Sequence, residues 1–299
     1  MAKKSKSKLP VFAIVLLAVL LFYFLTLLLP LIWAIYTSLK DTIEYEISKV
    51  WPSLEITFEN YVNAFNGFSM DVMRTDSSTG IMYKDTIGFD VMMLNSIIYA
   101  VGSSFIQTAI ICVTAYATSR FSFKFDKVVY TTVIVTMILP IIGSLPSELR
   151  VAKLLQLYDS IWGMFLMKAN FLGMYYLIFH AMFRGIPKDF DEAAYIDGAG
   201  NFTIFFKIIL PLIVGTFTTV MLIKFIDFWN DYTTPMVYMP SFPTISLGLY
   251  NLVSGTKNGT ASTQGELAAA MIVFIPNFTV FIIFRDKLIG NISMGGLKE

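Results

Sequence analysis

The sequence is poor in the residues on which most enzymes and metal proteins depend. Its 299 residues include one cysteine, Cys112, and one histidine, His180, so neither a disulfide framework nor a multi-histidine metal cage is available. Charged residues make up only 14% of the chain and the net charge is +1, which argues against a nucleic-acid-binding surface. No segment matches the phosphate-cradling motif G-x4-G-K-[ST]. We therefore expect no catalytic, cofactor-binding or metal-binding residues in this chain.

What the chain has in abundance is apolar sequence. Hydrophobic residues make up 56% of it and its mean hydropathy is +0.67, whereas soluble domains are about 45–50% apolar and about 25% charged. The first apolar run is too long for a signal peptide and no small-residue cleavage site follows it, so we interpret it as a retained membrane helix. Six runs are candidate membrane helices: about Val11–Tyr36, Leu94–Thr118, Val128–Ile142, Ile161–Phe183, Lys207–Trp229 and Leu267–Phe284. The third is the weakest, because Pro140 and Pro146 interrupt its outer end.

The distribution of positive charge predicts the orientation of these six helices. With the N-terminus inside, thirteen of the 22 Lys and Arg residues fall in cytoplasmic segments, and the long segment 41–91 holds nine Asp and Glu against three Lys and Arg. This bias follows the positive-inside rule. The sequence thus predicts an all-α membrane protein with both termini in the cytoplasm: a basic tail 1–10, a six-helix domain 11–289 and a tail 290–299. Its outer loops are 41–91 and 231–265, and its main cytoplasmic loop is 184–207.

The cytoplasmic loop 184–207 has the composition of a short helix. Pro187 suits a first helical turn, where its missing N–H is not needed. Asp191 and Glu192 in the same turn complement the helix dipole. Ala193 and Ala194 are strong helix formers with small side chains, so the surface of another protein can approach closely.

The end of that helix is also marked in the sequence. Gly198 fits a C-terminal cap, where the chain takes a left-handed conformation. Asn201 can cap a second helix that runs into the fifth apolar run, and Pro211 is expected to bend it. The result is a rigid knob joined through a glycine pivot to a membrane helix, although an ordinary amphipathic loop is the plain alternative.

Together these positions form a longer signature. The spacing EAA-x3-G-x9-I-x-LP resembles the signature of the membrane-spanning subunits of ABC importers, in which this loop couples to a separate ATPase. The resemblance implies the following coupling residues: Asp191, Glu192, Ala193, Ala194, Asp197, Gly198, Ile208, Leu210 and Pro211. ATP and Mg²⁺ would then be used by that ATPase, and this chain would not be an enzyme.

Other segments resemble the carbohydrate-uptake branch of these importers, specifically its MalG-type permeases. They are FIDFWNDYTTPMVY at Phe225–Tyr238, PTISLGL at Pro243–Leu249, FENYVNAF at Phe58–Phe65, Asn95-Ser96 and the terminal GGLKE. The resemblance implies the type I importer fold in a bacterial cytoplasmic (inner) membrane, where the chain is multi-pass. The implied partners are a MalF-like permease, a cytoplasmic ATPase dimer, an extracytoplasmic sugar-binding protein and a sugar substrate. A permease for a polyamine or phosphonate is the alternative.

Polar residues at membrane depth are candidates for the translocation path. They are Ser103, Gln107, Lys224, Asp227, Trp229 and Asn230. Inserting a charged side chain at the centre of a membrane helix costs roughly 2.5–3.5 kcal/mol, so each charged residue there is expected to have a structural or functional role. Each has a structural alternative. Lys224 and Asp227 can form a salt bridge, the hydroxyls of the second apolar run can serve helix packing, and Trp229 can belong to the aromatic belt at the membrane interface. Lys168 is interpreted as snorkelling to the interface.

The segment Ser254–Gln264 in the outer loop 231–265 is the candidate contact with the binding protein. The family resemblance implies that this loop reaches into the sugar cleft of that protein, although a plain solvated loop has the same composition. The candidate residues are Gly255, Thr256, Lys257, Asn258, Gly259 and Thr260. The purpose of the long loop 41–91 stays open. An intramembrane enzyme would need H-E-x-x-H or paired aspartates, and a proton-coupled carrier would need more buried carboxylates than the sequence offers.

Overall fold

The computed structural model describes residues 11–52, 55–75, 80–139, 143–254 and 262–293. The chain divides into two compact units, Met1–Gly67 with Asn251–Ile272 and Phe68–Tyr250 with Val273–Glu299. In the described part, four helical stretches are long and apolar enough to cross a bilayer. They are Val11–Ser38, Phe89–Arg120, Asn201–Asn230 and Thr263–Arg285.

The first unit is built around the end of its long N-terminal helix. It contains α1 (Val11–Ser38), α2 (Thr42–Ile47) and α3 (Glu59–Gly67). Lys40, fully buried, donates from Nζ to the backbone oxygens of Ser48 at 2.6 Å and Trp51 at 2.5 Å. Asn60 Nδ2 donates to the Lys40 carbonyl at 2.7 Å. A single lysine thus organises the turn that follows α1.

The second unit begins with an antiparallel hairpin that the all-α prediction did not include. Strand β1 (Ser69–Thr75) pairs with β2 (Met82–Gly88), with Val72 opposite Asp85. Val72 is buried, and ion pairs join Arg74 to Asp85 at 3.3 Å and Lys84 to Asp71 at 3.1 Å. The sequence analysis placed these residues in the outer loop 41–91, because charged side chains on two short strands neutralise one another only when the strands pair.

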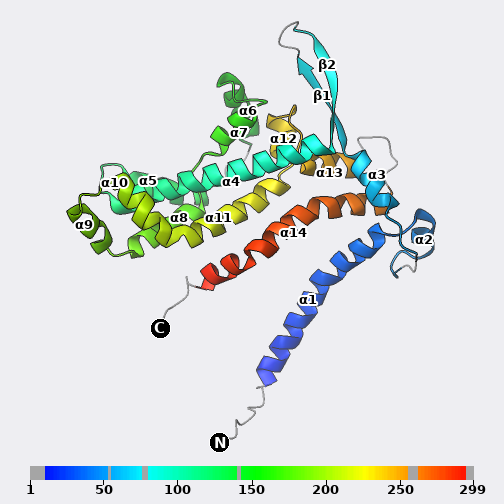
Figure 1. The fold of residues 1–299 in the computed structure, drawn as a ribbon, viewed down its shortest axis with the longest axis horizontal. Coiled ribbons are helices and arrows are strands. Elements are labelled where there is room, and N and C mark those ends of the chain that lie inside the picture. Colours follow the sequence, from blue (N-terminus) through cyan, green and yellow to red (C-terminus); the bar gives the residue numbers. More distant parts are fainter. Residues whose placement is uncertain (1–10, 53–54, 76–79, 140–142, 255–261, 294–299) are drawn as a thin grey trace, which may run out of the picture. The chain divides into compact units, whose positions relative to one another are not determined.

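Helix α4 (Phe89–Arg120) is the axis of the second unit, with α11 (Leu210–Asn230) and α8 (Met174–Gly185) packed along it (Figure 1). Its 32 residues extend over about 48 Å at a rise of about 1.5 Å per residue. The hairpin adjoins its N-terminal end, and α9 (Asp189–Ile196) lies at its other end (Figure 1). Helix α7 (Ile161–Lys168) approaches α4 closely at Gly102. The Phe165 ring lies over this glycine, and a Cβ at position 102 would be only 2.2 Å from the ring.

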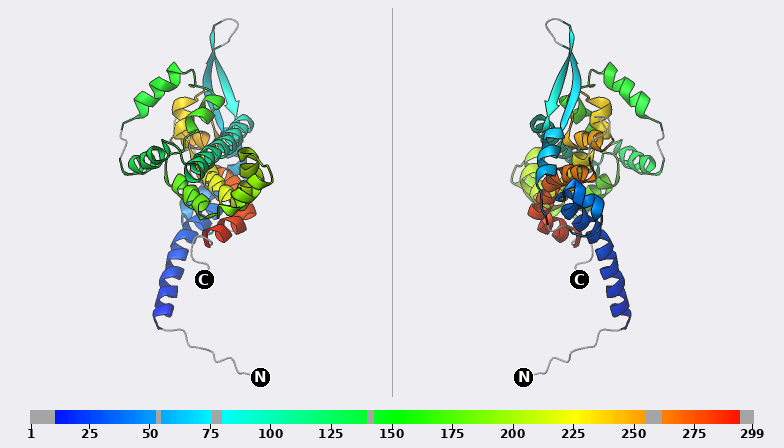
Figure 2. Two further views of the ribbon diagram at one scale, coloured as in Figure 1. Left: turned by 90° about the vertical axis from the view of Figure 1, so that its left-hand side faces the viewer. Right: turned by 90° about the vertical axis from the view of Figure 1, so that its right-hand side faces the viewer.

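The third predicted membrane helix is shorter than expected. Helix α5 (Asp126–Ile138) has 13 residues, about 20 Å, and α6 (Leu145–Leu154) follows as a separate helix. Both lie to one side of the α4–α11 pair (Figure 2). The helix ends ahead of Pro140 because a proline disfavours helical geometry in the residue before it.

The fourth predicted membrane helix is divided into two. Helix α7 ends at Lys168 and α8 begins at Met174. Between them Gly173 has φ +121°, a conformation that residues with a side chain rarely adopt. The unit continues through α12 (Thr233–Tyr238), α13 (Ile245–Val253) and α14 (Thr263–Ser293), of which the last two also extend into the first unit.

Candidate functional site

The predicted knob of the cytoplasmic loop is present as α9. Lys188 is its N-cap residue, so Pro187 lies one position before the N-cap instead of in the first turn. Asp189, Asp191 and Glu192 occupy the first turn and complement the positive end of the helix dipole. The short helix therefore begins where its acidic residues predict.

The predicted glycine cap is confirmed. Gly198 has φ +78°, its N–H donates to the Tyr195 carbonyl at 3.0 Å, and the Ala199 N–H donates to the Ala194 carbonyl at 2.9 Å. These two bonds form a Schellman motif, which needs a left-handed residue at this position. Ala194 is a buried member of the core cluster of this unit, and Ala199 packs against the same cluster.

The prediction that Asn201 caps the next helix is wrong. Gly200 is the N-cap of α10 (Asn201–Ile204), and Asn201 Oδ1 instead accepts a hydrogen bond from the Tyr195 hydroxyl on α9. The asparagine therefore joins the two short helices across the glycine pivot.

The I-x-LP part of the signature has a clear structural role. A π-helical turn, η1 (Phe205–Ile209), precedes α11, and the Leu210 N–H donates to the Phe205 carbonyl five residues earlier. Pro211 has no N–H to donate to the carbonyl four residues before it, and a wider turn accommodates that loss. The structure thus has a π-turn at the join between α10 and α11, directly before the predicted bend at Pro211.

One face of α9 packs into an aromatic core. Ala194 is buried there, and Tyr116 of α4 is the central ring, with centroids 4.7 Å from Phe205 and 5.3 Å from Phe183. Ile204 is also buried in this cluster. These side chains come from α4, α8, α10 and η1, so the inner face of α9 packs against four other elements.

An ion pair that the sequence analysis missed holds α9 to α4. Arg120 Nη1 lies 3.4 Å from Asp191 Oδ2, and the two side chains are only 4% and 16% exposed. Arg120 Nε and Nη2 and Asp191 Oδ1 have no hydrogen-bond partner among the described residues. In the sequence Arg120 counted only as one of the cytoplasmic positive charges, because nothing in a linear pattern pairs it with a residue 71 positions later.

The opposite face of α9 is exposed and apolar. Ile196 is 86% exposed and Phe202 of α10 is 82% exposed. Phe190, Ala193 and Ile196 are spaced three residues apart along the helix, and all three are exposed. We call the exposed residues Phe190, Glu192, Ala193, Ile196 and Phe202 the coupling surface. Asp197 is also exposed, at the C-cap.

The predicted path residues on α11 do not share one environment. Lys224 Nζ lies 3.3 Å from Asp227 Oδ2 and 5.0 Å from the Tyr175 ring centroid, so the proposed i, i+3 pair is present. Trp229 is 2% exposed and donates from Nε1 to the Val273 carbonyl of α14. Asn230 is exposed and accepts a hydrogen bond from Asn277 Nδ2 at 3.3 Å.

The predicted path residues on α4 lie inside the helix packing. Ser103 and Gln107 are buried, and Ser103 Oγ and Gln107 Oε1 have no partner among the described residues. A path through these groups stays a prediction. The candidate residues of the binding-protein loop, 255–260, lie outside the described residues, as do the tails 1–10 and 294–299.

Lys168, for which the sequence suggests snorkelling, makes polar contacts with α12 and with the residue that caps α11. Its Nζ donates to Thr234 Oγ1 at 3.0 Å and lies 3.8 Å from Asp231 Oδ2. Tyr99 OH donates to the same carboxylate oxygen at 2.8 Å, and the Thr234 N–H donates to Asp231 Oδ1 at 2.9 Å. Asp231 therefore connects α4, α7 and α12. Over the described ranges, no group of three or more His, Cys, Asp or Glu side chains could hold a metal ion.

Comparisons with known proteins agree with this geometry. Residues 107–290 match the family model of the binding-protein-dependent transport system inner membrane component. The chain is 26% identical to the trehalose transport system permease protein SugB of Mycobacterium tuberculosis, over 91% of this chain and 92% of that protein. It is 30% identical to the galactooligosaccharides transport system permease protein GanQ of Bacillus subtilis, over 64% and 68% of the two chains.

A solved structure shares the fold. A chain of a bacterial ABC transporter involved in the import of the acidic polysaccharide alginate superposes with a TM-score of 0.74 at 22% identity, covering 96% of this chain and 98% of that chain. The family match includes α9, the π-turn and α11, where the signature residues are held. The chain therefore belongs to the family of binding-protein-dependent transport system inner membrane components.

Proposed function

We propose that this chain is one permease subunit of an ATP-driven, binding-protein-dependent importer for a sugar or oligosaccharide. The observation that carries the proposal is the family match, which includes α9. This short helix is capped, packs against the protein on one face and is exposed on the other, as a helix that docks on a partner would be. The carbohydrate assignment follows the relatives, whose names specify trehalose and galactooligosaccharides. The relatives reported above give no support to a polyamine or phosphonate.

In this function the coupling surface is the docking site of a cytoplasmic ATPase dimer that binds ATP and Mg²⁺. Apolar residues exposed on a short helix are suited to a groove on a partner. Movement of α9 passes to α4 through the Arg120–Asp191 pair and to α11 through the π-turn. The chain needs no nucleotide site of its own.

The membrane topology completes the proposal. Six crossings with both termini in the cytoplasm place α9 inside and the hairpin outside, at opposite ends of a helix about 48 Å long, longer than the roughly 30 Å hydrocarbon core. Helix α5 and the α7–α8 pair are the short or interrupted crossings. The non-helical backbone between α7 and α8 is tolerated at membrane depth where protein or a water-filled cavity surrounds it. A MalF-like permease would supply the other half of the path.

The test is assembly and transport with the cognate partners. We expect Ile196→Asp, which places a charge on the coupling surface, to abolish ATPase association and ATP-dependent sugar uptake. Leu154→Asp makes the same kind of change at another exposed residue, on α6, and should leave ATPase association intact. The proposal fails if Ile196→Asp inserts normally, retains the ATPase and supports uptake at the rate of the parent chain.

A further inference from the structure

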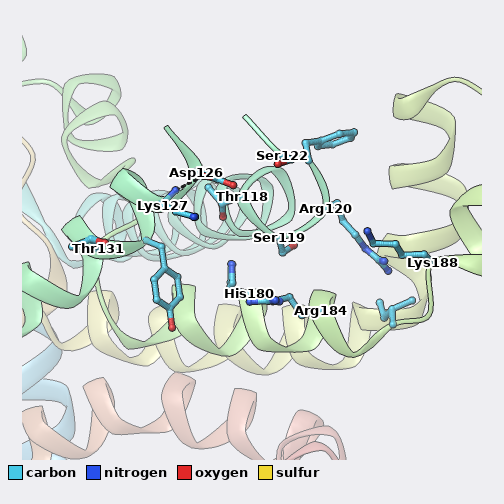
Figure 3. A pocket seen from close by; sticks show the side chains of 13 residues that line it. Thr118, Ser119, Arg120, Ser122, Asp126, Lys127, Thr131, His180, Arg184 and Lys188 are labelled. Atoms are coloured by element: carbon cyan, nitrogen blue, oxygen red, sulfur yellow. Dashed lines mark hydrogen bonds between the residues drawn. The ribbon is translucent and has the colours of Figure 1, made fainter. Parts of the chain in front are cut away.

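A basic cavity of about 690 Å³ lies beside α9 (Figure 3). It is formed by the C-terminal end of α4, the start of α5 and the end of α8, and its size is within the range of ligand pockets. Four cationic side chains line the cavity: Arg120, Lys127, Arg184 and Lys188. Asp126 is the one carboxylate in the lining. Asp126 is already engaged, because its Oδ1 accepts from the Lys127 N–H at 2.5 Å. The lining therefore favours an anion.

One of these cations has unused hydrogen-bond donors. The Arg120 side chain is 4% exposed, and its Nη1 faces Asp191. Nε and Nη2 have no partner within the described part of the chain. Buried guanidinium donors are ordinarily satisfied, so the missing acceptor is expected from a group that enters the cavity. A phosphate offers several acceptor oxygens and the complementary charge.

An apolar groove continues from the cavity along α5. Lys127 and Thr131 line both the cavity and a shallow groove of about 370 Å³, which also involves Val128, Thr132 and Val135. Val128 and Val135 are exposed. A basic recess joined to an apolar strip along a helix matches a phospholipid, with its phosphate in the recess and an acyl chain on the strip.

We propose that this lipid site, the basic cavity together with the α5 groove, binds an anionic phospholipid. The phosphate accepts from Arg120 Nε and Nη2, while Lys127 and Arg184 neutralise the headgroup and one acyl chain lies along α5. Basic pockets between membrane helices on the cytoplasmic side commonly hold such headgroups. The assignment to the cytoplasmic leaflet rests on the proposed function, but the binding does not. Because Arg120 Nη1 stays paired with Asp191, lipid occupancy is linked to the position of α9.

The test is lipid binding to the full-length chain, purified in an uncharged detergent and measured by native mass spectrometry. Phosphatidylglycerol, phosphatidylcholine and glycerol 3-phosphate are titrated separately. The cavity variant is Lys127→Gln with Arg184→Gln, both at exposed positions. The matched control, Lys124→Gln with Lys207→Gln, removes the same charge from exposed residues that do not line the cavity.

We expect the cavity variant to bind phosphatidylglycerol about 25-fold more weakly, since each lost cation near an anionic lipid lowers affinity by about fivefold. The control should bind like the parent chain, and phosphatidylcholine should bind weakly to all three. Equal phosphatidylglycerol affinity in the cavity variant would overturn the site. Glycerol 3-phosphate binding as tight as phosphatidylglycerol would overturn the lipid assignment in favour of a soluble phosphate ester. Because the assay contains neither ATPase nor sugar, its outcome is separate from that of the uptake experiment.

Discussion

Removing either charge of the Arg120–Asp191 pair should loosen α9, but by unequal amounts. Asp191→Asn leaves a guanidinium that is 4% exposed without its counter-ion, and breaking a buried pair in this way costs roughly 3–5 kcal/mol. We expect about 3 kcal/mol here, because the pair keeps some access to water. Arg120→Gln leaves the better-solvated Asp191 carboxylate, 16% exposed, and should cost about 1–2 kcal/mol.

The two substitutions together should cost less than their sum, because neither charge is then left buried alone. The measurement is hydrogen exchange of the α9 amides in the full-length chain held in lipid nanodiscs. A local cost of about 3 kcal/mol corresponds to roughly 150-fold faster exchange. The matched control is Asp189→Asn, an exposed carboxylate in the same helical turn, which should lose only about 0.5 kcal/mol of dipole interaction.

Two results would refute this reasoning. Additive effects in the double variant would mean that the two side chains do not interact. Equal effects of Asp189→Asn and Asp191→Asn would mean that the helix dipole, and not the ion pair, holds the first turn of α9.

Three further predictions concern the rest of the second unit. Gly198→Ala should weaken the α9 cap by about 1–2 kcal/mol, because Gly198 has φ +78°. Gly185→Ala is the control: a Cβ also has open space there, but φ is not positive, so the substitution should leave the α9 cap unchanged. ATPase association of the two variants provides the measurement. Gly102→Ala should lower thermal stability by about 1–3 kcal/mol through overpacking against Phe165, and Phe165→Leu should restore part of it. Lys168→Met should destabilise the chain by about 1–2 kcal/mol because Asp231 loses a cationic partner; an unchanged melting temperature would contradict that role.

The sequence predicted helix α9 and its glycine cap well because their determinants are local. Acidic residues in the first turn of α9 and a glycine after its last turn act through backbone geometry within a few residues, so linear spacing is sufficient evidence. The Asn201 cap was mispredicted because two adjacent residues, Gly200 and Asn201, can both serve as N-caps, and the Tyr195 hydroxyl engages the second. The hairpin was missed because Arg74 and Asp85 neutralise one another only when the strands pair.

The division of the fourth predicted membrane helix could not be predicted from hydropathy. Apolar composition continues through Ala169–Gly173, but Lys168 contacts Asp231 and Gly173 has φ +121°, a backbone conformation that is not helical, so the helix divides there. The burial of Trp229 and Ser103 was likewise unpredictable, because both depend on which helices pack around α4 and α11. Hydropathy indicates whether a segment prefers lipid to water, but it does not predict which face of a membrane helix packs against other helices.

By itself, the sequence determined that this is a membrane protein whose main loop carries the signature of the importer family, because apolar length and short-range spacing are properties of the linear chain. The tertiary structure alone decided which charges hold that loop in place. Arg120 and Asp191, like Lys168 and Asp231, are far apart in the chain, and only helix packing brings each pair within 4 Å. It also decided where a cationic cavity opens, because the positive charges of α4, α5 and α8 converge only when those helices are assembled.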